Sequence, residues 1–152
     1  MKVRPSALLI RTTNGQRQVL LMHYRYGEAD VYALPGGNPD RGETLTETVV
    51  RELREELGIV VSVGEALFFG EMLLSEHKDD VLHVVFGADI QEGTPILNPA
   101  ETSALAVQWI DVEKLTQLNL YPNVGDEIKR YALMQSVVPM GYIGRIEQQY
   151  FG

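Results

Sequence analysis

The chain has 152 residues, 45% of them apolar, and this length suffices for one domain with a single sizeable core. Its formal charge of −8 at pH 7 excludes the basic surface that long nucleic acids require, although small phosphorylated ligands remain compatible because a bound cation can supply positive charge. The absence of cysteine excludes disulfides, thiolate nucleophiles and zinc–sulfur sites, so oxygen or imidazole must hold any metal ion. We therefore expect a single domain over residues 1–152.

Strand and turn signals dominate the first third of the chain. Apolar and β-branched runs alternate with polar or glycine-containing stretches. The predicted segments are strands over residues 3–13, 18–22 and 31–34, a hairpin turn at Asn14-Gly15 and a surface loop over residues 25–30. The apolar run over residues 7–10 is too short for a signal peptide or a membrane span, so we expect a soluble, cytoplasmic protein.

A helix is predicted over residues 45–57. Thr44 and Glu47 have the spacing of a capping box at its start, and Gly58 is the residue type that ends a helix in the left-handed conformation. At about 100° per residue, the apolar positions of this helix gather on one stripe that can pack on a sheet. These positions are Leu45, Val49, Val50, Leu53 and Leu57.

The second half of the chain is again rich in strands, with two further helices. The predicted segments are two short strands or one bulged strand over residues 59–74, a charged turn over 76–80, strands over 81–88 and 105–110, a loop over 93–99, a short helix from Asp111 as N-cap to Leu118, and a helix over 124–137. Residues 139–152 receive no assignment. Strands with helices inserted between them predict an α/β/α sandwich, with a mixed sheet between helices.

Between Gly37 and Ile59, particular residue types occur at fixed spacing. Gly37 is followed after five residues by Glu43, and after seven more by Arg51-Glu52-Leu53-Arg54-Glu55-Glu56-Leu57-Gly58-Ile59. Glu52, Glu55 and Glu56 are spaced i, i+3 and i+4, so on a helix they share one face. Three carboxylates this close repel one another unless they bind a hard divalent cation or keep protons at raised, coupled pKa values.

This 23-residue pattern resembles the Nudix box, the signature of the Nudix hydrolases, at every fixed position. A chance match at nine constrained positions has a probability on the order of 10⁻⁹ per window. The Leu34-Pro35-Gly36-Gly37 stretch before the box, and Glu101 followed by Trp109 after it, are also similar to the family. The resemblance implies an α/β/α sandwich and a pyrophosphohydrolase that acts on phosphorus-containing acid anhydrides with Mg²⁺ or Mn²⁺ as cofactor.

The resemblance also implies roles for individual residues. Glu55 and Glu56 are the firmest metal ligands, and Glu52 is either a ligand or a base that polarises the attacking water; we favour both roles for Glu52, with the identity of the general base left open. Glu101 is the best match to a further base or ligand that the family places in a loop before the last strands. Arg51 is expected to orient the carboxylates, since it can pair with Glu55 or with Glu43.

Candidate substrate-binding residues lie before the box. Gly36 and Gly37 permit a loop whose main chain approaches metal ions and phosphates closely. Tyr24 and Tyr32 flank this region, where a base can stack on a tyrosine ring. Glu43 is expected to support Arg51 rather than to bind a metal ion.

The predicted function is cleavage of a pyrophosphate bond in a nucleoside diphosphate linked to another moiety, or in a nucleoside triphosphate. The region over residues 74–77 carries no signature that selects a substrate. One alternative is a catalytically silent Nudix-fold sensor or interaction domain that binds a nucleotide, although no box glutamate is lost. An isomerase or RNA-processing member of the same fold is a third reading. We expect a small nucleotide-type substrate as partner, with no long nucleic acid and no membrane, and leave a homodimer open.

Overall fold

The computed structural model describes residues 1–74, 78–134 and 139–148. The α-helices in this part of the chain are α1 (Leu45–Leu57) and α2 (Gly125–Leu133), and a 3₁₀ helix, η1, spans Val112–Gln117. The strands are β1 (Lys2–Leu8), β2 (Ile10–Thr13), β3 (Gln16–Tyr26), β4 (Ala29–Ala33), β5 (Val60–Met72), β6 (Val81–Glu92), β7 (Ala106–Asp111), β8 (Leu120–Tyr121) and β9 (Gly141–Arg145).

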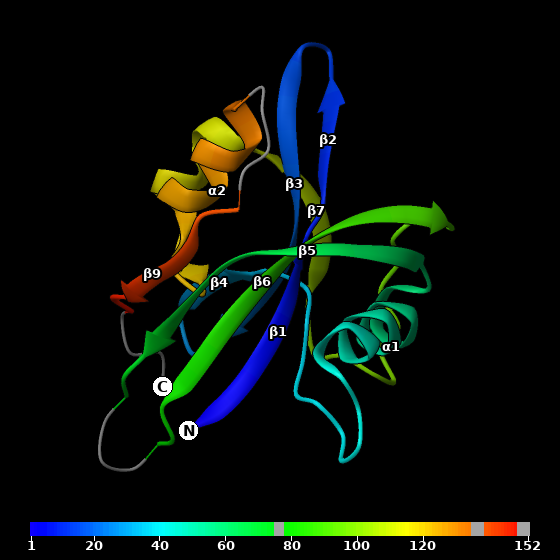
Figure 1. Cartoon of the computed structure of the whole chain (residues 1–152). Helices are drawn as coiled ribbons and strands as arrows, with labels where there is room; N and C mark the ends of the chain where they lie inside the picture. The colour runs from blue at the N-terminus through cyan, green and yellow to red at the C-terminus, as the bar shows by residue number, and fades with distance from the viewer. Residues whose placement is uncertain (75–77, 135–138, 149–152) are drawn as a thin grey trace.

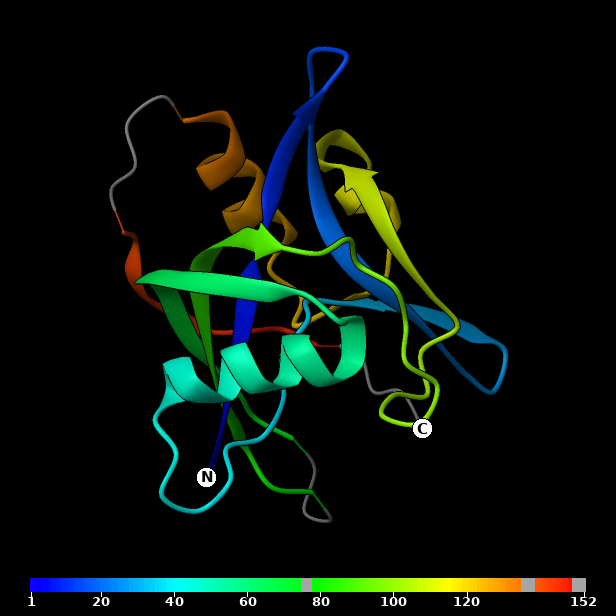
Figure 2. The same ribbon diagram turned by 90° about the vertical axis from the view of Figure 1, so that its right-hand side faces the viewer.

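The strands form two mixed sheets between the helices (Figure 1). One sheet has the order β1-β6-β5-β9, in which β5 and β6 are antiparallel while β1 and β9 run parallel to their neighbours. The other has the order β2-β3-β4-β8, with β7 paired to β3. The helices α1 and α2 lie on opposite sides of the strands in both views (Figures 1 and 2). The predicted class of mixed β-structure between helices is therefore confirmed, although the strands divide into two sheets.

Helix α1 begins and ends where its sequence predicts. The Thr44 side chain accepts a hydrogen bond from the Glu47 amide, and the Glu47 side chain accepts one from the Thr44 amide, which completes the capping box. At the other end Gly58 has φ 66°, the left-handed conformation that glycine adopts without a steric penalty. The buried face of the helix contains Val49, Leu53 and Leu57, each fully buried, as the apolar stripe indicates.

The predicted strand over residues 3–13 is in fact two strands in different sheets. β1 pairs with β6, whereas β2 pairs with β3, and the chain passes from one sheet to the other at Leu9. Leu9 is buried, as is Leu8, whereas Ile10 is only partly buried. Because the apolar run continues through this crossing point, composition could not reveal the break.

Several other predicted boundaries are corrected. The loop over residues 25–30 is only a tight turn at Gly27 and Glu28, since β3 extends to Tyr26. The region over 59–74 contains one strand, β5, rather than two. Its pairing with β6 shifts register three times, so the prediction of one bulged strand is confirmed. The helix after Asp111 is a 3₁₀ helix, and the Asp111 carboxylate accepts a hydrogen bond from Gln18 instead of capping it.

The C-terminal part departs furthest from prediction. α2 ends at Leu133, and residues 135–137 of the predicted helix lie outside the described residues, as do residues 76 and 77 of the predicted charged turn. The strands β8 and β9 were not predicted, because β8 has two residues and β9 contains two glycines.

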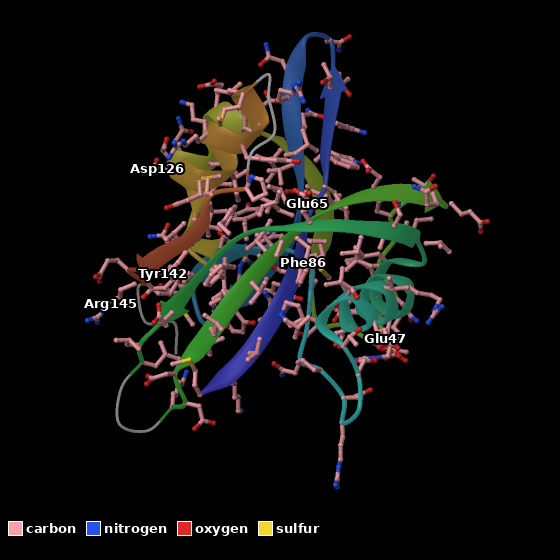
Figure 3. All side chains as sticks on the ribbon, in the orientation of Figure 1. Glu47, Glu65, Phe86, Asp126, Tyr142 and Arg145 are labelled. Carbon is pink, nitrogen blue, oxygen red and sulfur yellow. The ribbon has the colours of Figure 1, made fainter. Side chains whose placement is uncertain are left out.

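Two groups of buried side chains form the interior. One joins α1 to β1, β3, β5 and β6, and includes Leu53 and Phe86, the latter labelled near the centre of Figure 3. The other joins η1 and α2 to the opposite faces of the strands, and includes Leu21 and Ile128. The described residues contain no helix with the length and apolarity needed to cross a membrane.

We expect Thr44→Ala to lower the free energy of unfolding by about 1 kcal/mol, because the side chain that accepts the Glu47 amide is lost. Chemical denaturation would measure the change. Thr44→Ser, which keeps an acceptor oxygen, should remain within a few tenths of a kcal/mol of the parent. Equal losses in both variants would show that the hydrogen bond does not stabilise the helix.

Candidate active site

The loop before α1 places two glycines between β1 and the acidic helix. The Gly37 amide donates to the Pro5 carbonyl at 3.3 Å, and Gly36 forms a bridge with Ser6 of β1. A Cβ added at Gly36 would overlap the Pro5 carbonyl, and one added at Gly37 would overlap the Glu52 carboxyl. Both glycines therefore provide the space in which β1 and Glu52 approach this loop. Gly36 itself is buried.

Arg51 lies at the centre of an acidic cluster. Its Nε donates to Glu43 Oε2 at 2.7 Å and its Nη2 donates to Glu43 Oε1 at 3.0 Å, so the pair is bidentate. Its Nη1 donates to Glu52 Oε1 at 3.1 Å and to Glu55 Oε2 at 3.2 Å. A further bond from Nη2 reaches the Asn38 carbonyl in the preceding loop. One guanidinium thus fixes three carboxylates of the box and the loop that leads to them.

This cluster strongly favours the charged form of its best-paired members. The hydrogen bonds from Arg51 lower the pKa of Glu43 to about 2, with help from the Asp40 amide and the Thr48 hydroxyl. The same bonds to Glu43 raise the pKa of Arg51. The side chain of Glu43 is only 14% exposed and points at Arg51, so its contacts are those of a support for the arginine.

The pKa values of Glu52 and Glu56 are raised, in contrast to that of Glu43. Burial raises the pKa of Glu52 despite its contact with Arg51. Burial, followed by the charge of Glu52, raises the pKa of Glu56 to about 7. Among the described residues no side chain donates a hydrogen bond to the Glu56 carboxylate, and the charge of Arg4 only partly offsets the cost of its burial.

The donor set suits a hard divalent cation. Glu52, Glu55 and Glu56 supply only oxygen ligands, and Arg51 engages one oxygen each of Glu52 and Glu55, which leaves the second oxygen of each carboxylate available. In the conformation of residues 1–74, 78–134 and 139–148, no three acidic or imidazole side chains are already placed to hold a metal ion. A cation bound here would require these carboxylates to move closer together than they lie in this conformation.

Glu101 reaches the same region from a different part of the chain. It belongs to the segment between β6 and β7, which runs past the C-terminal end of α1 (Figure 2). Its charge contributes to the raised pKa of Glu56. The structure therefore brings Glu101 into electrostatic range of the box carboxylates, as an exposed side chain on a loop.

A cleft of about 440 Å³ lies beside the acidic cluster. Its walls are mostly apolar or aromatic, with cationic and amide groups among them. The lining residues are Arg4, Tyr24, Tyr26, Val31, Ala33, Met72, Leu74, Lys78, Tyr121 and Gln148. Its volume falls in the range of small-molecule sites. The charge of Arg4 acts on both Glu52 and Glu56, so the cleft adjoins the carboxylates.

The two predicted tyrosines lie on opposite faces of the sheet. Tyr24 lines the cleft, where its ring stacks on Tyr26 with centroids 6.0 Å apart and its hydroxyl lies 3.4 Å from that of Thr102. Tyr32 instead stacks on His23, with centroids 4.6 Å apart, and packs against the interior on the α2 side. Because successive residues of a strand point to opposite faces, Val31 and Ala33 of β4 line the cleft and Tyr32 does not.

Sequence reasoning missed Arg4. Its Nη2 donates to the Leu34 carbonyl at 3.1 Å, its guanidinium carbon lies 5.2 Å from the centroid of the Tyr121 ring, and its Nη1 is buried with no hydrogen-bond partner among the described residues. The only available signal was a charged residue within an apolar strand. Tyr121 could not have been found, because the strand β8 that positions it was not predicted.

Comparisons with known proteins found a matching domain family and several relatives of this chain. A profile of the NUDIX domain matches residues 2–132. An ADP-ribose pyrophosphatase of Methanocaldococcus jannaschii is 32% identical over 57% of this chain and 50% of that protein. The oxidized purine nucleoside triphosphate hydrolase of Danio rerio is 31% identical over 65% of this chain and 59% of that protein. The chain spans about half the length of the curated relatives it matches.

A similar fold occurs in solved structures. The crystal structure of the MutT protein from Bacillus halodurans superposes with a TM-score of 0.70 and covers 95% of this chain and 90% of that chain. Only 22% of the aligned residues are identical, so the likeness establishes the shared fold.

The raised pKa of Glu56 predicts a pH-dependent stability in the absence of divalent cations. Between the usual carboxyl pKa of 4.5 and the folded-state value of about 7, the folded protein binds more protons than the unfolded chain, so this group destabilises the fold increasingly as the pH rises through 7. We expect Glu56→Gln to melt at a higher temperature than the parent at pH 8, and at about the same temperature at pH 4.

Glu47→Gln is the matched control on the same helix. Hydrogen bonding within the capping box lowers the pKa of Glu47, so its charged form stabilises the fold and neutralisation should not raise the melting temperature at pH 8. Differential scanning fluorimetry in chelator would measure both variants. A Glu56→Gln variant that melts below the parent at pH 8 would contradict the assignment of a destabilising charge.

Proposed function

This chain belongs to the NUDIX domain family, and from that premise we propose that it is a divalent-cation-dependent pyrophosphohydrolase. Its substrate is a nucleoside diphosphate linked to another moiety, or a nucleoside triphosphate. The proposal rests mainly on one observation. The carboxylates of α1, above all Glu56 with its raised pKa, lie beside a cleft of nucleoside size that contains Arg4 and Tyr24.

Glu52, Glu55 and Glu56 are the residues that would hold Mg²⁺ or Mn²⁺. When bound, the cation neutralises charge on the phosphate oxygens and lowers the pKa of a water molecule. The raised pKa of Glu56 fits this role, since a cation and a proton compete for the same unneutralised carboxylate. Arg51 binds one oxygen each of Glu52 and Glu55, and the Glu52 carboxyl lies against Gly37.

The chain's own residues supply the remaining requirements of the reaction. Water adds to one phosphorus atom, the bridging P–O bond breaks, and the proton lost by water passes to a base while the leaving phosphate takes up negative charge. Glu52 is the proposed base, because burial raises its pKa toward the operating pH and makes it a better proton acceptor. Glu101, on the facing loop, is a second candidate for the same step or a further ligand.

The cleft receives the nucleoside part of the substrate. Tyr24 and Tyr26 present stacked rings, and Met72 and Leu74 supply an apolar wall against which a base can lie. Arg4 stands between this wall and the carboxylates, where a guanidinium can donate to a phosphate oxygen. The names of the two relatives, one for ADP-ribose and one for oxidized purine nucleoside triphosphates, support this nucleotide class without choosing between its two forms.

We expect Glu56→Gln to lower kcat by roughly 10²- to 10⁴-fold with magnesium, since it removes a ligand without removing core volume. The assay is a panel of nucleotide sugars, dinucleotides and nucleoside triphosphates, with released phosphate and pyrophosphate distinguished. The control is Glu65→Gln. Glu65 belongs to β5, is labelled in Figure 3 and lies in a hollow on the α2 side, so this variant should retain parental activity.

A magnesium-dependent rise in melting temperature should accompany turnover in the parent and be reduced in Glu56→Gln, because a ligand that binds the native state stabilises it. A parent that binds nucleotides from the panel yet releases neither product would support the silent sensor instead. Equal activity in the parent and Glu56→Gln would overturn the assignment of the site.

We expect Arg4→Met to raise KM about tenfold or more while kcat changes less, because a hydrogen bond to a charged group contributes about 1.5–3 kcal/mol. Steady-state kinetics on the best substrate of the panel would measure both constants. The matched control is Arg11→Met: Arg11 lies 4.5 Å from the centroid of the Trp109 ring, outside the residues that line the cleft. A similar KM in both variants would remove Arg4 from the substrate site.

A further inference from the structure

The C-terminal end of α1 is bound by a segment that is distant in sequence. The last carbonyls of a helix have no partner within it and need hydrogen-bond donors from outside the helix. Gly58 and Ile59 supply the first two, to Arg54 and Leu53. The next three are bound by the segment over residues 96–98, which lies beside this helix end in Figure 2.

Asn98 provides two of those three donors. Its amide N–H donates to the Glu56 carbonyl at 2.9 Å, and its side-chain Nδ2 donates to the Glu55 carbonyl at 3.3 Å. The Ile96 amide donates to the Leu57 carbonyl at 3.0 Å. Asn98 is thus attached to the main chain of the two residues that are the firmest metal-ligand candidates.

The other polar groups of Asn98 hold the turn that carries Glu101. The Asn98 carbonyl accepts from the amides of Glu101 at 3.0 Å and Thr102 at 3.1 Å. Its Oδ1 accepts from the Ala100 amide at 3.1 Å. Thr102, in turn, approaches the hydroxyl of Tyr24 in the cleft. Every hydrogen-bonding group of this one residue therefore joins α1 on one side to the Glu101 turn on the other.

We infer that Asn98 is a positioning residue, which sets the place of Glu101 relative to the carboxylates of α1. The inference rests on the proposed function in so far as Glu101 takes part in the reaction. Asparagine suits the position because its side chain both donates and accepts. An aspartate here would lose the donor and would place a negative charge at a helix C-terminus, close to Glu56.

The test separates positioning from plain stabilisation by a double-mutant cycle. Asn98→Ala removes only the side-chain bonds to the Glu55 carbonyl and the Ala100 amide, since the main-chain bonds persist. We expect it to lower kcat about ten- to a hundredfold with KM changed less than twofold, because a catalytic group displaced by an ångström loses that much rate. In a Glu101→Gln background the same change should lower kcat less than twofold, since the group being positioned is already absent.

Two further variants frame the result. Asn98→Ser keeps an acceptor for the Ala100 amide and should recover most of the lost kcat. Asn119→Ala removes another exposed asparagine whose Nδ2 donates to a distant main-chain carbonyl, that of Asp30 at 3.2 Å, and should leave kcat unchanged. A loss in Asn98→Ala that is equally large in the Glu101→Gln background, or a loss of the same size in Asn119→Ala, would overturn the inference.

A second measurement keeps the inference independent of turnover. Mn²⁺ added to the parent should broaden the NMR amide signals of residues 100–102, and this broadening should weaken more than twofold in Asn98→Ala as the turn moves away from α1. Unchanged broadening in the variant would contradict the inference, even if no compound in the panel is hydrolysed. A parent that shows the expected broadening but hydrolyses nothing would instead contradict the proposed function.

Discussion

The rest of the site depends on the hydrogen bonds between Arg51 and the carboxylates around it. A single guanidinium donates to Glu43, Glu52 and Glu55 at distances of 2.7–3.2 Å, so it fixes their directions without cancelling their summed charge. Glu56 lies outside this set, and burial, followed by the charge of Glu52, raises its pKa to about 7. Burial and the nearby charge of Glu52 favour the protonated form of Glu56, and under the proposed function a divalent cation would compete with that proton for the carboxylate.

The fold tolerates this electrostatic cost because α1 is anchored on its other sides. Val49, Leu53 and Leu57 are fully buried, and burial of such a side chain contributes roughly 1.5–3 kcal/mol to the stability of the fold. The capping box fixes the first turn, and the segment over residues 96–98 binds the last carbonyls. With both ends and one face held, the remaining face can carry charges that would not stabilise a free helix.

The local features of this helix followed from sequence because each depends on near neighbours. The bounds of α1 rest on Thr44, Glu47 and Gly58, which act within one turn of the helix. The sequence also predicted that Arg51 pairs with Glu55, one helical turn away, or with Glu43 from the preceding loop, and the structure shows both pairs. The division of residues 3–13 between two sheets was not, because the choice of partner strand at Leu9 depends on contacts with residues far along the chain.

The cleft shows the same limit at the level of the site. Tyr24 and Tyr32 are indistinguishable by composition, and only the pairing of β4 with β3 decides that Tyr24 lines the cleft while Tyr32 packs on the opposite face. The position of Arg4 in the cleft depends on its contacts with Leu34 and Tyr121, which lie 30 and 117 positions further along the chain. Long-range pairing therefore builds the cleft, and local pattern builds the carboxylate cluster.

These two origins bear on how so acidic a protein would bind the polyanion that the proposed function requires. With a net charge of −8, the chain repels a free nucleotide at long range, and the carboxylates of α1 strengthen that repulsion next to the cleft. Arg4 counters it only locally, through a guanidinium already engaged with Leu34 and Tyr121. The favourable arrangement is one in which a divalent cation lies between the carboxylates and the phosphates, because it converts both sets of negative charge from a penalty into ligands. Under the proposed function, the charge that opposes substrate binding is also the charge that would hold the cation, so the acidic pattern of α1 and the cleft built by long-range pairing would act together.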